Sequence, residues 1–304
     1  MSRTTQTCPQ PGSPSQCCLE ILAHEPSQNH EPLSQGEHHA TLLSIQFESG
    51  VPRLEQFGRE LIRDHLLSFA CKYSNRQSLN IDYYGLEQLA KAARTVYSTP
   101  RYQKRGEFGE LILHAILESF FGTTVAVAKL AFKTARNDTV KGFDAVHVIE
   151  RDGDLELWLG EAKFYTDANR AVSDLITELN EHLGDEYLRD EFTPITTMLD
   201  DSQSHTAALR LLLGTKNTLD NIKAKLVVPA LITYESSSMA AITEHSDTST
   251  QALSSETLKI LENFGRKIGR IGDQIRIQLI ILPLQSKEKL IEELHNRLNH
   301  YKEL

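Results

Sequence analysis

The side chains best suited to chemistry in this chain are two carboxylates and one amine within a single short segment. Asp144, Glu161 and Lys163 lie in the stretch KGFDAVHVIERDGDLELWLGEAKFY, residues 141–165, in which two apolar runs flank the dipeptide Asp152-Gly153. Asp-Gly is typical of the two-residue type I′ turn that joins antiparallel strands. We therefore expect a β-hairpin that carries charge at the end of each strand away from the turn.

A turn at Asp152-Gly153 determines which residues face each other across the hairpin. Asp144 then lies opposite Glu161. Between these acids and the turn, apolar residues are paired, Val146 with Leu159 and Val148 with Leu157. Because side chains alternate between the two faces of a strand, all six side chains share one face. The sequence thus predicts an apolar patch with a carboxylate pair at its end.

Opposed carboxylates in an apolar face require compensation, and a divalent cation provides it. The β-carbons of directly opposed residues lie roughly 5 Å apart, so like charges there are destabilising. Mg²⁺ takes carboxylate oxygens and keeps several waters, so we expect Asp144 and Glu161 to bind Mg²⁺, with Mn²⁺ as the alternative ion. Lys163 lies on the same face, where a lysine can orient or deprotonate a water or steady charge on a phosphate. The peptide carbonyl of Ala162 is near enough to be a further ligand.

A simpler interpretation needs no metal. Asp144 could end its strand in water, and Glu161 with Lys163 could form a surface ion pair, which contributes less than about 1 kcal/mol. We favour the metal site because the aspartate is in register, its neighbours on that face are apolar, and an acidic helix precedes the hairpin. A bulge in either strand would shift this register.

The acidic helix is expected over EFGELILHAILESFFG, residues 107–122, in which apolar residues recur at helical intervals before Gly122. Glu110 borders the apolar face and is the candidate for an additional acid at the metal site. Glu107 is the weaker candidate, because a carboxylate in the first turn is also favoured by the helix dipole. His114, one turn after Glu110, could help to bind substrate, although a single helical histidine is more often structural or exposed.

The rest of the chain alternates between short apolar runs and amphipathic segments. Strands are expected over 40–49, 123–132, 224–236 and 273–284, although Pro229 weakens the third of these as a strand. Helices are expected over 54–70, 84–97, 167–183, about 204–214, 255–268 and 286–304. Short apolar strands among helices predict an α/β fold, a mixed β-sheet with helices on both faces.

The composition divides the chain into three parts. Residues 1–40 are rich in Pro, Ser, Gln and His and are expected to be a mostly disordered tail. Residues 41–100 are expected to form an N-terminal strand and a helical extension, for which partner docking is a fair hypothesis. Residues 101–304 are expected to form the main domain, which contains the acidic helix and the hairpin.

Size, charge and hydropathy exclude several classes of protein. The 304 residues are enough to bury a large core. A net charge of −9 argues against a stand-alone protein that grips nucleic acid over a wide basic face. No apolar run is long enough for a membrane span and no secretory signal is visible, so we expect a cytoplasmic protein without membrane attachment. The four cysteines show none of the usual zinc-ligand spacings.

The order of these features resembles the PD-(D/E)XK nuclease superfamily. The residues that carry the resemblance are GFDAV at 142–146, GEAKFY at 160–165 and the preceding RGEFGELILHAIL at 105–117. The resemblance implies a restriction-endonuclease-like sheet, Mg²⁺ held by Asp144 and Glu161, Lys163 assisting the attacking water, and Glu110 completing the acidic set. Phe143 replaces the proline that usually precedes the aspartate, a departure that is common in the superfamily.

The same series of motifs, with the long continuation to residue 304, also resembles the HamA family, the nuclease subunit of the Hachiman anti-phage defence system. This resemblance covers roughly residues 41–304. It implies a superfamily 2 helicase partner, HamB, and a complex that is restrained until phage attack and then degrades DNA. The acidic net charge is compatible with a nuclease that relies on a helicase to engage DNA.

We therefore predict a Mg²⁺-dependent DNA endonuclease of bacterial antiviral defence. Two alternatives stay open: another PD-(D/E)XK nuclease of restriction or repair type, and a non-catalytic partner-binding protein of the same fold. The basic residues that could contact phosphates are Lys141, beside the site, and Arg101, Lys104 and Arg105, ahead of the acidic helix.

Overall fold

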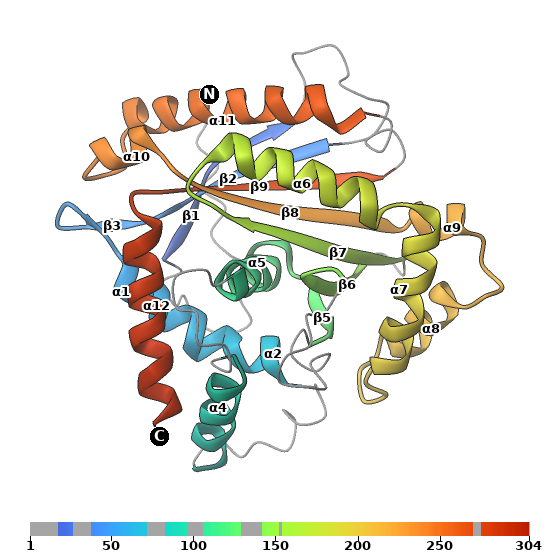
Figure 1. Ribbon diagram of the computed structural model, residues 1–304. Helices are drawn as coiled ribbons and strands as arrows, with labels where there is room; N and C mark the ends of the chain where they lie inside the picture. The colour runs from blue at the N-terminus through green and yellow to red at the C-terminus, as the bar shows by residue number, and fades with distance from the viewer. Residues whose placement is uncertain are drawn as a thin grey trace.

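The fold is built on a mixed seven-stranded sheet with the strand order β1-β2-β9-β8-β7-β6-β5 (Figure 1). The computed structural model describes residues 18–26, 38–71, 83–96, 106–128, 142–151, 154–269 and 275–303. The strands of this sheet are β1 (Leu19–Pro26), β2 (His38–Ile45), β5 (Thr124–Val127), β6 (Ala145–Arg151), β7 (Asp154–Phe164), β8 (Leu226–Glu235) and β9 (Arg276–Leu284). The predicted mixed α/β sheet is confirmed.

The centre of the sheet is parallel and its two edges are antiparallel. Strands β2, β9, β8 and β7 pair in parallel, whereas β1 adds to β2, and β6 and β5 add to β7, in antiparallel fashion. Strands β8 and β9 are buried along nearly their whole length. Their sequences are accordingly almost continuous apolar runs, as expected for parallel strands covered on both faces.

Helices cover both faces of the sheet (Figure 1). One face carries α6 (Ala168–His182), α7 (Asp185–Met198), α8 (Thr206–Leu213), α9 (Leu219–Lys223), α10 (Ser237–Ala241) and α11 (Asp247–Ile268). The other carries α1 (Leu54–Glu60), the π-helix η1 (Leu61–His65), α2 (Leu66–Ala70), α4 (Tyr83–Val96), α5 (Gly106–Phe121) and α12 (Lys287–Lys302). Two hydrophobic cores result, one on each side of the sheet.

Helix α5 packs closely on β7, and it matches the predicted acidic helix. Phe108, Leu111 and Ile112 are almost fully buried against the sheet. Gly109 allows the close approach, because a β-carbon at this position would lie 2.7 Å from the β-carbon of Phe164. The helix ends before Gly122, whose φ of +66° suits glycine.

The prediction of disorder for residues 1–40 is wrong for the part that the structure describes. Leu19–Pro26 forms β1, which pairs with β2 along its length, and Cys18 is buried at its start. The prediction rested on the polar composition of the whole segment, which hid the short apolar run within β1, formed by Leu19, Ile21, Leu22 and Ala23. Residues 1–17 and 27–37 lie outside the described residues.

Strand β8 is regular and central, although Pro229 was expected to weaken it as a strand. The strand lies in the middle of the sheet, between β9 and β7, although proline is normally confined to edges and bulges. The β7–β8 ladder pairs Trp158 with Val227 and then resumes with Glu161 and Ala230, so the proline falls in the intervening gap. Gly160 provides room there, since a β-carbon at residue 160 would lie 3.3 Å from the ring of Pro229.

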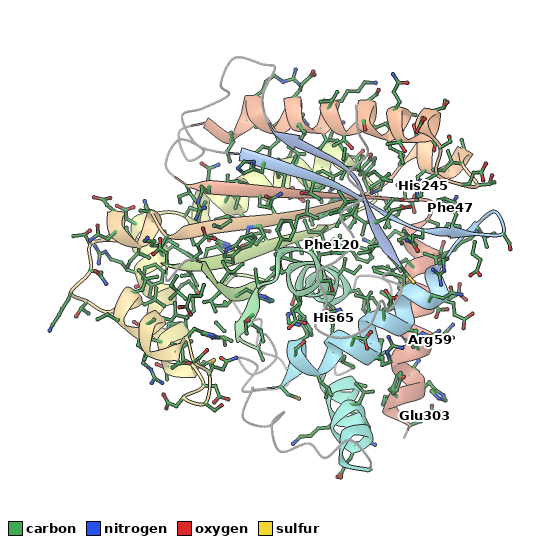
Figure 2. All side chains as sticks on the ribbon, turned by 180° about the vertical axis from the view of Figure 1, so that it is seen from behind. Phe47, Arg59, His65, Phe120, His245 and Glu303 are labelled. Carbon is green, nitrogen blue, oxygen red and sulfur yellow. The ribbon has the colours of Figure 1, made fainter. Side chains whose placement is uncertain are left out.

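Other predicted elements were found with altered limits. The strand expected over 40–49 is divided into β2 and β3 (Phe47–Glu48), and β3 pairs with β4 (Val51–Pro52) in a small second sheet. The ring of Phe47 meets His245 edge-on, with 5.0 Å between ring centroids (Figure 2). Helix α11 begins before residue 255, and α7, α9 and α10 were not predicted. Within the part of the chain that the structure describes, no helix has both the length and the apolar character needed to cross a membrane.

The contact between α5 and β7 leads to a stability prediction. Replacing Gly109 with Ala forces the added methyl group against Phe164, and overpacking of this kind typically costs about 1–3 kcal/mol. Gly106→Ala is the matched control, because nothing lies within 4 Å of a β-carbon at residue 106. Urea denaturation should show a lower midpoint for Gly109→Ala alone; equal midpoints for both variants would contradict this close packing.

Candidate functional site

The hairpin formed by β6 and β7 has the register that the sequence predicts. Val146 pairs with Leu159 and Val148 with Leu157. Beyond the last paired residues, the backbone N–H of Asp144 donates to the carbonyl of Gly160 at 2.8 Å. The turn residues 152–153 lie outside the described residues, so the type of turn stays a prediction.

The predicted common face is confirmed for its four apolar residues and for Glu161. The four apolar residues of the patch all belong to the core beneath α6. Glu161 and Lys163 continue the same alternation along β7, so they lie under α6 as well. Their exposed fractions are 1% and 4%. A surface ion pair between them is therefore excluded, and buried charges of this kind require partners.

Helix α6 supplies those partners. The carboxylate of Glu178 forms an ion pair with Lys163 Nζ. His182 Nδ1 lies 2.6 Å from Glu161 Oε1, so that its N–H donates to the carboxylate. Lys163 Nζ itself lies 4.0 Å from Glu161 Oε2. Residues four apart on a helix lie on one side of it, which is why Glu178 and His182 can reach neighbouring positions of the same strand.

Glu178 and His182 are functional candidates that the sequence analysis missed. The available signal was a Glu and a His four residues apart in the helix that directly follows the Glu-x-Lys strand. Both border the apolar stripe of α6, which includes Leu175 and Leu179. Sequence reasoning had no means to choose them over the other polar residues of that helix.

Two aromatic rings hold His182 in place. The ring of Tyr187, from α7, stacks on it with 4.5 Å between centroids and 18° between planes. Phe143 meets it edge-on at 5.5 Å. Phe143 is itself buried. The residue that stands just before Asp144 thus packs against the histidine that contacts Glu161.

Asp144 is half-buried and is oriented by the backbone of β7. Its Oδ2 accepts a hydrogen bond of 2.9 Å from the N–H of Ala162. Gly142, two residues earlier, has a φ of +128°, which favours glycine. A β-carbon there would lie 2.5 Å from Oε2 of Glu191 on α7. Asp144 therefore lies beside Glu161, as predicted, and Glu191 brings another carboxylate to the adjacent loop.

The charges at the site shift two pKa values. Burial is the main cause that raises the pKa of Glu161, from the ordinary 4.5 to about 7, and the nearby charge of Asp144 raises it further, against the opposing effects of His182 and Lys163. Burial lowers the pKa of His182, but its hydrogen bond and attraction to Glu161 outweigh this and raise it. A cation at the two carboxylates would offset the cost of ionising Glu161.

Glu110 belongs to α5, which lies on the other side of the sheet. It follows Gly109, which packs against Phe164 and Ala162 on the face of β7 that lies away from α6. Glu110 is partly buried. Its role as an additional acid, and that of the Ala162 carbonyl as a ligand, stay predictions.

The remaining predicted contacts fall elsewhere. His114 is 2% exposed and lies within the core on the α5 side, so it does not face the carboxylates as a substrate-binding residue would. The proposed phosphate contacts lie outside the described residues: Arg101, Lys104, Arg105 and Lys141.

The chemistry of the donor set suits a hard divalent cation. Asp144 and Glu161 offer carboxylate oxygens from adjacent strands, and such oxygens are what Mg²⁺ and Mn²⁺ prefer. A buried amine, Lys163, lies within 4.0 Å of one of these carboxylates. The arrangement can bind a cation, position a water and place positive charge beside a phosphate.

The raised pKa of Glu161 leads to a pH-dependent stability prediction. Glu161 loses its proton near pH 4.5 in the unfolded chain but only near pH 7 in the folded chain. Between these pH values the folded chain must give up its bound proton, so the free energy of unfolding falls as the pH rises from 4.5 through about 7. Glu161→Gln removes the charge but keeps the shape. In EDTA at pH 8 we expect this variant to be more stable than the parent by up to about 3 kcal/mol, with a gain that shrinks towards pH 4.5.

Thermal unfolding followed by circular dichroism measures this difference. Glu181→Gln is the matched control, because Glu181 is an exposed acid on the same helix. A Glu161→Gln variant that unfolds below the parent at pH 8 would show that the ionised carboxylate is stabilised by its neighbours.

Comparison with known proteins identifies the family of this chain. A search of the curated proteins finds no match. The sequence profile described as HamA matches residues 20–298, which is nearly the whole chain and includes most of β1, both strands of the hairpin and α6. The chain therefore belongs to the HamA family, which is associated with Hachiman defence.

Proposed function

We propose that this protein is a metal-dependent DNA endonuclease of the PD-(D/E)XK type that acts in anti-phage defence. The observation that carries the proposal is the buried Glu161–Lys163 pair on β7 with Asp144 beside it. A fold gains little stability from burying such a set, because each charge loses its hydration. The family to which the chain belongs gives the defence setting.

Each residue of the site has a role in phosphodiester hydrolysis. Asp144 and Glu161 would hold Mg²⁺ or Mn²⁺, which when bound lowers the pKa of a water ligand and stabilises negative charge on the phosphate. Lys163 would orient the attacking water or take its proton. Glu178 holds the amine of Lys163 in place. Glu110 would complete the acidic set from α5.

His182 acts on Glu161 and not on the substrate. Its Nδ1–H donates to Oε1 of Glu161 and leaves Oε2 on the side of Lys163. Phe143 and Tyr187 restrict the rotation of the imidazole. His182 is therefore a positioning residue, comparable to the hydrogen-bonded groups that orient the ligands of other metal sites.

The charge of the whole chain favours a partner that delivers DNA. A net charge of −9 opposes binding to a polyanion over a wide surface. A helicase such as HamB, the partner that the resemblance implies, would supply the DNA contacts. The active site would then need to grip only the phosphate being cleaved.

Cleavage of supercoiled plasmid by the purified protein tests the activity. We expect loss of supercoiled DNA with Mg²⁺, and none with EDTA or with Glu161→Ala or Lys163→Ala. Glu181→Ala, which removes an exposed acid of α6, should cleave like the parent. If the isolated chain does not cleave the plasmid, the assay is repeated with HamB and ATP. If the complex does not cleave plasmid either, the proposed nuclease activity is wrong, and a non-catalytic, partner-binding protein is favoured.

The positioning role of His182 gives a separate prediction. His182→Ala should raise the Mg²⁺ concentration needed for half-maximal cleavage by about 10–100-fold, the usual effect of losing a hydrogen bond to a metal ligand. The rate at saturating Mg²⁺ should change less. His300→Ala, at an exposed histidine of α12, is the control. An unchanged Mg²⁺ requirement would exclude this role.

A further inference from the structure

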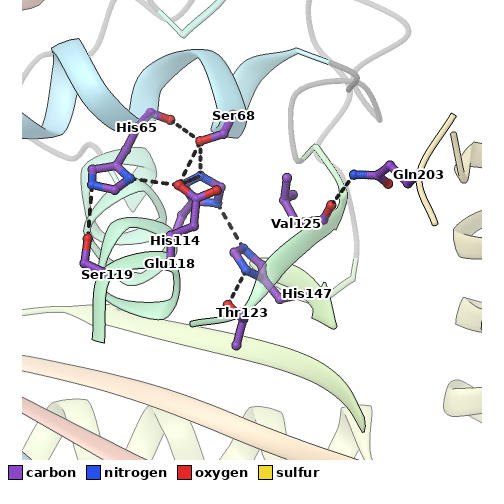
Figure 3. A network of polar contacts seen from close by, with 9 residues as sticks. All are labelled: His65, Ser68, His114, Glu118, Ser119, Thr123, Val125, His147 and Gln203. Carbon is purple, nitrogen blue, oxygen red and sulfur yellow. Dashed lines mark hydrogen bonds and ion pairs between the residues drawn. The ribbon is translucent and has the colours of Figure 1, made fainter. Parts of the chain in front are cut away.

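A second cluster of possible metal ligands lies on the opposite side of the sheet, between the N-terminal helices and α5 (Figure 3). It consists of His65, the last residue of the π-helix η1, and His114 and Glu118, one turn apart on α5. His65 Nδ1 lies 2.8 Å and His114 Nε2 lies 3.3 Å from Oε2 of Glu118. All three ligand atoms lie within 4.8 Å of one another.

Two of these separations are close to those of a bound zinc ion, and the third, between the two histidine nitrogens, is at most 4.8 Å. Zinc bonds to histidine nitrogen and carboxylate oxygen are about 2.0–2.1 Å long, so tetrahedral ligands lie about 3.3 Å apart. The His114–Glu118 distance already has this value. The His65–Glu118 distance needs to open by only a few tenths of an ångström.

The outer nitrogens of both histidines have hydrogen-bond partners. His114 Nδ1 lies 3.0 Å from His147 Nε2, and His147 Nδ1 lies 2.8 Å from Thr123 Oγ1. His65 Nε2 lies 3.3 Å from Ser119 Oγ. When these outer atoms donate, the inner nitrogens of both rings are left with free lone pairs beside Oε2 of Glu118. Figure 3 shows these contacts. Metal-bound histidines almost always have such a partner on the other nitrogen.

The cluster is open to solvent on one side, and a fourth polar group lies beside it. The side chains of His65 and Glu118 are 16% and 23% exposed, so an ion can enter from solvent, whereas His114 is deeply buried. Ser68 Oγ lies 2.7 Å from His114 Nε2 and 3.0 Å from Glu118 Oε2. This hydroxyl, or a water in its place, would provide the fourth ligand. Figure 2 shows His65 among the helices on this side of the sheet.

We propose that His65, His114 and Glu118 form a zinc site that joins the N-terminal helices to the core helix α5. The ligands come from segments that are about 50 residues apart in sequence, so a bound ion would fasten η1 and α2 to the sheet. Two neutral imidazoles and one carboxylate match a borderline cation such as Zn²⁺ better than Mg²⁺. The π-helical turn that ends at His65 is a rare structure that recurs at functional sites.

The site is independent of the proposed nuclease centre. It lies on the α5 face of β6 and β7, whereas Glu161 and Lys163 lie on the α6 face. His147 of β6 belongs to the network, and its neighbours Val146 and Val148 point to the other core. Zinc binding can therefore be tested in a chain whose carboxylate centre has been removed.

The test uses the full chain without a histidine tag, carrying Asp144→Asn and Glu161→Gln. The protein is stripped with EDTA, incubated with Zn²⁺ and passed through a desalting column, and zinc is counted by mass spectrometry. The same chain is titrated with Co²⁺, whose visible absorption reports four-coordinate binding. Thermal unfolding with and without Zn²⁺ gives a third readout.

We expect about one zinc per chain, visible Co²⁺ absorption without the near-ultraviolet band of thiolate ligands, and a higher unfolding temperature with Zn²⁺. Glu118→Gln and His65→Asn should each weaken binding by more than about 100-fold, the upper end of what losing an outer partner costs. His300→Asn, at an exposed histidine, should bind like the parent.

Two variants keep the test decisive if one fails to fold. His65 is partly exposed, so His65→Asn should fold even if Glu118→Gln does not. Equal zinc content in the parent and in a folded ligand variant would overturn the proposal. So would the absence of zinc and of Co²⁺ absorption in the parent. Either result would mean that the cluster is a hydrogen-bonded network that only packs α5 against its neighbours.

Discussion

The burial of one carboxylate and one amine on the same face of β7 is the constraint on which the site depends. Glu161 and Lys163 are almost completely shielded from solvent, and unpaired charges in such a place would cost several kcal/mol each. Helix α6 offsets this cost with Glu178 and His182. The position of α6 over β7 is thus set by charge pairing as well as by the apolar contacts of the two elements.

The two faces of the hairpin differ in their side chains and in the helix that each contacts. On the α6 side, the strands carry an apolar patch and then the charged residues. On the α5 side, Gly160 and Ala162 present little bulk, and Gly109 lets the helix approach Phe164. This close contact fixes α5 to the strand that bears Glu161. It also places His114 of α5 beside His147 of β6, so that a polar cluster forms within the second core.

Local patterns predicted the hairpin well because its signals lie within a few residues of each other. The Asp-Gly pair and the alternation of Val146, Val148, Leu157 and Leu159 specify one register, and any slip by one residue would turn the apolar side chains away from the core. The apolar stripe of α5 is equally local. Strand β1 was not predicted, although its partner β2 is the next strand along the chain. The central place of Pro229 was not predicted either, since it depends on β9, which is distant in the chain.

The sequence by itself determined that Asp144, Glu161 and Lys163 share one end of one hairpin face, because turn type and strand alternation act over short distances. Only the tertiary structure decided that Glu161 and Lys163 are buried, that His182 and Glu178 contact them, and that His65 meets His114 and Glu118. Burial and partner choice arise where segments far apart in the chain pack together. No spacing within a single segment encodes them.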